Sequence, residues 1–274
     1  MKQMIRRGAG LLLVALFLVS GCLIAKHQMD SAAAENAGQQ AQTLAGAAIG
    51  DEVLEELPEP SIPLAELPEV PQQALPDEVM QCLTGLELDA LQTINAEVLG
   101  WICIPDTVIS YPLLQTSDNE TYLTKAWNGV YNSSGSIFLE CKSSPDFQDF
   151  NTIIYGHRMN DGSMFGGLRK YEDPDYLEAH PYIYIVTEQD VRRYQVFSAY
   201  EAPVRSNTYR LYIKEEQTKQ EALAHFINSS VLKSDVVPTT EDKILTLSTC
   251  TGKGNYNFRW VVQAVLIDCC AREQ

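Results

Sequence analysis

The hydrophobic positions of the chain follow different patterns before and after residue 100. Between residues 79 and 98 apolar side chains recur mostly at three- and four-residue steps, which predicts one or two short helices. Beyond Gly100 the apolar runs are short, rich in β-branched and aromatic residues and mostly bounded by Gly, Pro, Asn or Asp, as β-strands are. Eight such runs are predicted as strands: 101–104, 108–114, 136–139, 152–155, 182–186, 193–200, 244–249 and 259–267.

One helical pattern interrupts the predicted strands. From Glu215 to Leu232 apolar residues that include Ala222 and Phe226 share a helical face, with acidic residues early and Lys233 at the end. Eight strands over about 170 residues with one inserted helix predict a mainly β fold, a closed or nearly closed eight-stranded β-barrel with helical additions.

The N-terminal residues carry a third pattern. Gly8–Ala25 is an uncharged apolar run of 18 residues flanked by basic residues, and at about 1.5 Å per residue it spans roughly 27 Å. It predicts a membrane anchor over residues 1–27, with the N-terminus cytoplasmic and the rest of the chain outside the cell membrane. A cleaved signal peptide, or a lipoprotein with Cys22 in a lipobox-like sequence, would place the chain on the same side.

Charge is distributed unevenly along the chain. The formal net charge is −16, and residues 28–100, which contain no Lys or Arg, contribute −14 of it. Six prolines between Pro58 and Pro76 alternate with glutamates, so residues 28–76 are predicted as an acidic, extended linker, which leaves 77–274 as the globular domain. A chain this acidic is not expected to bind nucleic acid, because such binding requires a basic face.

Three residues with catalytic chemistry lie at predicted strand ends. His157 follows the strand at 152–155, and Cys250 ends the strand at 244–249. Arg259 opens the next strand, so a hairpin-like return would bring it close to Cys250. A guanidinium near a thiol favours the thiolate and can donate to an oxyanion, and a histidine would supply an acid and base. The spacing alone fits an inert cysteine and a surface arginine equally well.

The sequence around these residues resembles one enzyme family. Thr246–Cys250 is similar to the TLxTC motif of sortases, the cysteine transpeptidases of Gram-positive bacteria. Asn151–Met159 resembles the histidine region of class B sortases, and Phe258–Val262 resembles their arginine strand. The resemblance extends over about residues 77–268. It implies a sortase-type barrel with N-terminal helices and with one helix inserted between the sixth and seventh strands.

The resemblance also implies roles for the three residues. Cys250 would attack a carbonyl of a C-terminal sorting signal on an exported protein and form a thioacyl-enzyme. His157 would protonate the leaving amine and deprotonate the incoming one, while Arg259 would stabilise the oxyanion. Ser248 and Thr249 either contribute to substrate binding or only continue the strand.

The implied partners are a sorting-signal peptide, an amine of a peptidoglycan precursor or a pilin lysine, and the membrane through the N-terminal helix. Polymerisation of pilins, a thiol peptidase that releases its product to water, and an inert surface-binding barrel are the alternatives.

No cofactor or metal is expected. The sequence contains no CxxC motif, no clustered His and Cys residues and no Gly-rich phosphate loop. Cys103 and Cys141 are interpreted as core or strand-end thiols, and Cys82 as a helix residue. The vicinal pair Cys269 and Cys270 could form a strained disulfide or bind a metal, although neither is favoured.

Overall fold

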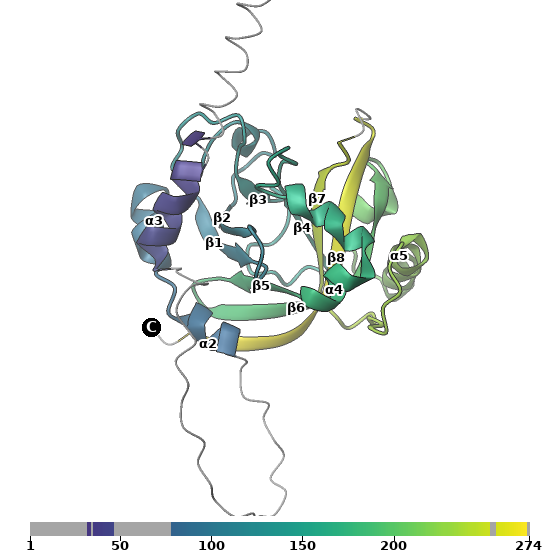
Figure 1. The fold of residues 1–274 in the computed structure, drawn as a ribbon. Coiled ribbons are helices and arrows are strands. Elements are labelled where there is room, and N and C mark those ends of the chain that lie inside the picture. Colours follow the sequence, from purple (N-terminus) through teal and green to yellow (C-terminus); the bar gives the residue numbers. More distant parts are fainter. Residues whose placement is uncertain (1–31, 34, 47–77, 253–255, 273–274) are drawn as a thin grey trace, which may run out of the picture.

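The computed structural model describes residues 32–33, 35–46, 78–252 and 256–272. Its centre is a closed β-barrel with the strand order β1-β2-β3-β4-β7-β8-β6-β5 (Figure 1). The β2–β3 and β4–β7 pairs are parallel and the other pairs are antiparallel. The predicted eight-stranded, mainly β barrel is therefore confirmed.

All eight predicted strands are present, with shifted ends. They are β1 (Val98–Cys103), β2 (Ser110–Leu114), β3 (Ile137–Leu139), β4 (Asn151–Tyr155), β5 (Tyr182–Val186), β6 (Asp190–Pro203), β7 (Ile244–Cys250) and β8 (Phe258–Ala271). β6 and β8 are each longer than predicted because they pair with one another along almost their whole length.

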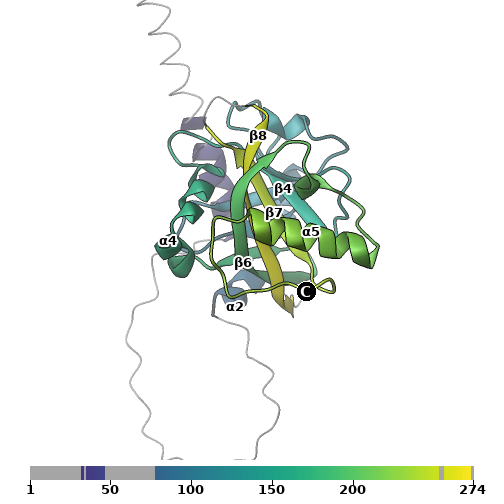
Figure 2. The same cartoon turned by 90° about the vertical axis from the view of Figure 1, so that its right-hand side faces the viewer.

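The helices decorate the outside of the barrel. They are α2 (Glu78–Thr84), α3 (Leu88–Ile94), α4 (Pro174–Ala179) and α5 (Glu216–Ser229), with three 3-10 helices, η1 (Thr121–Leu123), η2 (Gly166–Glu172) and η3 (Asn207–Tyr209). α5 is the inserted helix, and it lies between β6 and β7 in the chain as predicted. Figure 2 shows it crossing the outside of the barrel, where Leu223 and Phe226 pack against Phe197 and Val265.

Two apolar layers hold the barrel together. The interior is filled by side chains from alternate strand positions, among them Ile154, Leu247 and Trp260. A second cluster covers the outer face of β1 and β5, where α2 and α3 pack against Trp101. This alternation of buried positions on the two faces of a strand is what fixes the register of the strands.

Residues 35–45, which fall inside the stretch predicted as a linker, form a helix that packs on the domain. Ala41 and Ala45 are fully buried in the outer cluster. The indole Nε1 of Trp127 donates to the carbonyl oxygen of Ala37 at 2.7 Å. The remainder of the predicted anchor and linker lies outside the described residues, apart from residues 32–33 and Gly46.

The predicted location, a single membrane pass with an external domain, requires correction. In the part of the chain that the structure describes, no helix combines the length and the apolar character needed to cross a bilayer. The apolar run Gly8–Ala25 lies outside the described residues.

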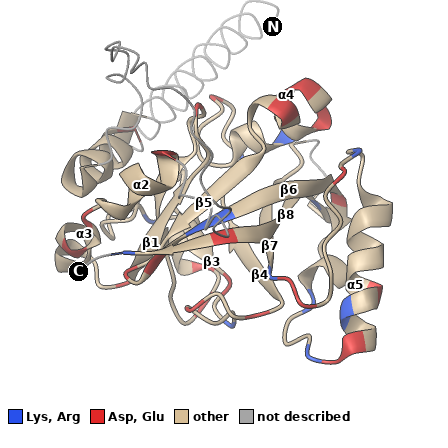
Figure 3. Cartoon of the chain, turned by 90° about the horizontal axis from the view of Figure 1, so that it is seen from below, with Lys and Arg blue, Asp and Glu red and all other residues tan. Residues whose placement is uncertain are grey.

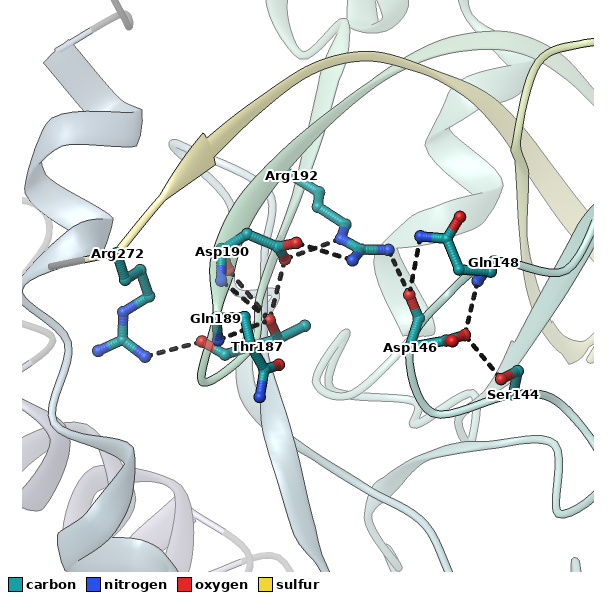
Figure 4. A network of polar contacts seen from close by, with 8 residues as sticks. All are labelled: Ser144, Asp146, Gln148, Thr187, Gln189, Asp190, Arg192 and Arg272. Carbon is teal, nitrogen blue, oxygen red and sulfur yellow. Dashed lines mark hydrogen bonds and ion pairs between the residues drawn. The ribbon is translucent and has the colours of Figure 1, made fainter. Parts of the chain in front are cut away.

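A polar network closes the end of the β6–β8 ribbon that lies away from Cys250 (Figure 4). The half-buried carboxylate of Asp190 accepts two hydrogen bonds from Arg192, at 2.7 and 2.8 Å, and Arg192 also donates to the carbonyl oxygen of Asp146. Arg272 donates to the carbonyl oxygen of Thr187 at 2.7 Å and to that of Thr84 at 3.0 Å. These bonds tie the end of β8 to the β5–β6 turn and to α2, and they have a structural role.

Close packing between β1 and β5 requires glycine at position 100. A Cβ added to Gly100 would overlap the carbonyl oxygen of Val186, which belongs to the backbone of β5 and cannot move aside. We expect Gly100→Ala to lower the free energy of unfolding by about 1–3 kcal/mol, as overpacking does. Urea denaturation measures this change. Gly167→Ala is the matched control, because nothing lies within 4 Å of its added Cβ; an equal loss in both variants would contradict the explanation.

Buried tyrosines make the fold sensitive to alkaline pH. Burial raises the pKa of eight tyrosines in the described residues, and for Tyr209 the pKa reaches about 12. Because the folded-state pKa exceeds the unfolded value of about 10, the protonated form is favoured by folding. Their contribution is therefore complete below about pH 10 and is lost as the pH rises through the folded-state values, at about 1.4 kcal/mol per unit of pKa difference.

We expect the urea midpoint to fall steeply between about pH 10 and about pH 12. Tyr209→Phe should make that fall shallower, whereas Tyr256→Phe, at an exposed position, should not. A midpoint that stays constant through this range would contradict the prediction.

Candidate active site

The predicted catalytic residues come from three neighbouring strands. Cys250 at the end of β7 is directly paired with Arg259 on β8. On the other side of β7, the parallel strand β4 pairs Tyr155 with Ser248. His157 follows Tyr155 by two residues, as Cys250 follows Ser248. The topology therefore brings all three residues to one end of the β4–β7–β8 sheet (Figures 1 and 2).

The three residues share the outer face of the barrel. Leu245 and Leu247 point into the interior core, so the alternate positions of β7, which include Ser248 and Cys250, face outward. The thiol of Cys250 is free and half-buried. By contrast Cys103 is buried, and burial raises the pKa of its thiol to about 12. Cys250 is thus accessible for reaction whereas Cys103 has the environment of a core thiol.

The imidazole of His157 is held by the segment that leads to β3. Its Nε2 lies 2.8 Å from the carbonyl oxygen of Leu123. A carbonyl oxygen only accepts hydrogen bonds, so Nε2 carries the proton and Nδ1 is the basic nitrogen of the neutral ring. This arrangement fixes the orientation of the ring and leaves one nitrogen able to accept a proton.

The guanidinium of Arg259 is bound only by carbonyl groups. Nη1 donates to the carbonyl oxygens of Tyr256 and Phe258, both at 3.0 Å. Within the described ranges, no carboxylate forms an ion pair with Arg259. Its charge is therefore available to a carbonyl oxygen that becomes negative next to Cys250.

The two residues predicted to contact substrate have buried hydroxyls. Ser248 Oγ lies 2.9 Å from the phenol oxygen of Tyr209 in η3. Thr249 is buried, and its Oγ1 has no hydrogen-bond partner. Substrate binding by Ser248 and Thr249 stays a prediction.

Tyr209 is a residue that sequence reasoning missed. Burial raises its pKa, and the charges of Arg259 and Cys250 act on it in opposite directions. The phenol thus stays protonated near neutral pH and packs beside the catalytic strand, where it also contacts Tyr200 and Val261. Position 209 lies in a stretch without strand or helix periodicity, so only the folded chain reveals its place.

Positive charge gathers around the segment that follows Cys250, although the whole chain is acidic. Figure 3 shows acidic residues spread over several elements, including α4 and α5. Arg169 Nη1 donates to the carbonyl oxygen of Thr251 at 3.4 Å and forms ion pairs with Glu172 and Glu201. Arg158 lies against Gly252: an added Cβ there would be 2.5 Å from the central carbon of the guanidinium. Two of the three arginines, Arg158 and Arg259, have no acidic partner among the described residues.

No grouping of three or more His, Cys, Asp or Glu residues that could hold a metal ion occurs in the described part of the chain. Cys269 and Cys270 are both free. The chemistry that this site supports is therefore built from a thiol, an imidazole and a guanidinium: nucleophilic attack, proton transfer and oxyanion stabilisation.

Comparison with known proteins assigns the domain. The model of the Sortase domain family matches residues 102–267, which includes all three residues. The chain belongs to the sortase family.

Its relatives place it in class B, as the sequence motifs predicted. It is 38% identical over 182 residues to sortase B of Listeria monocytogenes, which covers 66% of this chain and 74% of that protein. The Staphylococcus aureus sortase B–substrate complex is similar with a TM-score of 0.63 and 34% identity, over 66% of this chain and 84% of that one. Sortase B of B. anthracis in complex with AAEK1 matches with a TM-score of 0.68 and 30% identity, over 88% of this chain and 99% of that one.

Proposed function

We propose that this class B sortase cleaves a C-terminal sorting signal on exported proteins and joins the new carboxyl group to an amine of a peptidoglycan precursor. The observation that carries the proposal is the direct pairing of Cys250 with Arg259, with His157 at the same end of the adjacent strand. A sortase B has been solved in a complex with its substrate and another in a complex with triglycine, which supports a peptide and an amine as the two substrates.

In the first half-reaction the sulfur of Cys250 attacks the scissile carbonyl carbon. Arg259, which has no acidic partner among the described residues, stabilises the oxyanion as the tetrahedral intermediate forms. The carbon–nitrogen bond then breaks, and protonated His157 delivers a proton to the leaving amine. The product is a thioester on Cys250, so the first half-reaction is a peptidase step.

In the second half-reaction the acceptor amine replaces the leaving amine. Neutral His157 takes a proton through Nδ1, since Nε2 donates to the carbonyl oxygen of Leu123. The amine nitrogen attacks the thioester carbon, Arg259 again stabilises the oxyanion, and the carbon–sulfur bond breaks to release the thiolate of Cys250. A new amide joins the sorted protein to the acceptor.

The experiment is to incubate the protein with a sorting-signal peptide, with and without an amine acceptor, and to determine the masses of the products. Transpeptidation predicts a product in which the acceptor has replaced the residues beyond the cleaved bond. Hydrolysis alone in the presence of a peptidoglycan-type acceptor would show instead a thiol peptidase that releases to water. Joining of a pilin lysine in preference to the peptidoglycan-type acceptor would show a polymerising sortase.

A further inference from the structure

We propose that Arg158 binds a carboxylate of the amine acceptor and so selects acceptors that carry an acid close to the reacting amine. The inference rests on the proposed transpeptidation and specifies its second substrate. Arg158 follows His157 directly, and its guanidinium lies over the backbone of Gly252, two residues beyond Cys250.

The first step of the argument is the state of the guanidinium. Arg158 is half-buried, and its Nε is a buried donor without a hydrogen-bond partner. Nη1 makes one long contact, 3.5 Å, with the side-chain oxygen of Asn160. Among the described residues no carboxylate pairs with it. A partly buried cation with unused donors is costly unless an anion joins it, and a guanidinium matches a carboxylate through two parallel hydrogen bonds.

The second step is the space reserved for this side chain. Gly252 has a φ of +74°, and a Cβ there would lie 2.5 Å from the central carbon of the Arg158 guanidinium and 2.8 Å from its Nε. Any larger residue would push the guanidinium away from the segment that follows Cys250. The glycine therefore permits a planar cation to lie flat beside the nucleophile, at a position where the sequence alone showed only a turn.

The third step is the side of the thiol on which Arg158 lies. Across the sheet the order is β4, β7, β8, so His157 and Arg259 flank Cys250 on opposite sides. The acceptor amine must reach His157 to lose its proton, and it therefore approaches on the flank that carries Arg158. Arg259, on the other flank, faces the developing oxyanion.

The fourth step is the reach between the two points. Gly252 is two residues from Cys250, which is at most about 7 Å along the chain. A dipeptide spans about the same distance from its amine to its carboxylate. An acceptor with a carboxylate one or two residues from its amine can thus contact Arg158 while the amine attacks the thioester.

The test uses diglycine and diglycinamide, which differ only in the terminal carboxylate. The full chain is first converted to the thioacyl-enzyme with a sorting-signal peptide, and the rate constant for transfer to each acceptor is then measured at equal concentrations of unprotonated amine. We expect the wild type to prefer diglycine by about tenfold or more, as charge-assisted hydrogen bonds allow. Arg158→Gln should reduce the preference to less than about twofold. Arg158→Lys, which keeps the charge without the planar fork, should retain part of it.

Lys233→Gln is the matched control, since it removes one positive charge from an exposed position beyond α5, and it should keep the wild-type preference. An undiminished preference in Arg158→Gln would overturn the inference, and so would an equal slowing with both acceptors, which indicates a purely structural role. Absence of any thioacyl-enzyme in the wild type would overturn the proposed function, and this inference with it.

Discussion

Cys250→Ala is expected to abolish transpeptidation, with a loss of more than about a thousandfold in the rate of product formation. The thiol is half-buried but accessible at the end of β7, and it is paired with the strand that carries Arg259. Alanine removes the nucleophile while it preserves the strand, so no thioester can form. Initial rates with a sorting-signal peptide and an amine acceptor measure the loss.

Cys82→Ala is the control for this substitution. Cys82 is a free, exposed thiol on α2, away from the β4–β7–β8 strand ends. The control variant should retain wild-type rates and should still acquire the mass of the acyl group. Product formation by Cys250→Ala at a rate near that of Cys82→Ala would show that the reaction does not use this thiol.

His157→Asn should produce the second largest effect, a loss of about 10²–10⁴-fold in both half-reactions. The imidazole is oriented by the carbonyl oxygen of Leu123, and the same ring serves the leaving amine and the incoming one. An asparagine can replace the hydrogen bond to Leu123 but cannot transfer a proton. Rapid-mixing measurements of thioester formation and of thioester transfer to an amine separate the two losses.

His180→Asn provides the comparison for His157. The imidazole of His180 bonds to the carbonyl oxygen of Pro105 at 3.1 Å and stacks on Tyr176, which is a structural environment. This variant should lose stability before it loses catalysis. Slowing of only one half-reaction in His157→Asn would mean that another group carries the proton in the other half-reaction.

The strands could be predicted because each has a short apolar run between turn-forming residues. The pattern placed β7 within one residue of its true end. It shortened β6 and β8, since their outer portions alternate with charged residues such as Arg192 and Asp268 that reach their partners only once the two strands pair. α4 and η2 were not predicted, because they are short and their order comes from contacts such as that of Tyr171 with the barrel core.

The positions of the three catalytic residues could be predicted because each lies at a strand end, and strand ends of neighbouring strands meet. Tyr209 and Arg158 could not be identified in this way. Tyr209 reaches Ser248 across 39 positions of sequence, and Arg158 reaches Gly252 from the segment that follows another strand of the barrel. Contacts of this kind depend on barrel closure and on the path of the loops, which periodicity does not encode.

The most direct test of the account is to follow the thioacyl-enzyme itself. The protein is mixed with a sorting-signal peptide, the adduct is located by mass spectrometry of its proteolytic fragments, and an amine acceptor is then added to the isolated adduct. The account predicts an acyl group on Cys250 whose disappearance accelerates with acceptor concentration as the joined product forms. An adduct on another residue, or one that decays only by hydrolysis at every acceptor concentration, would contradict it.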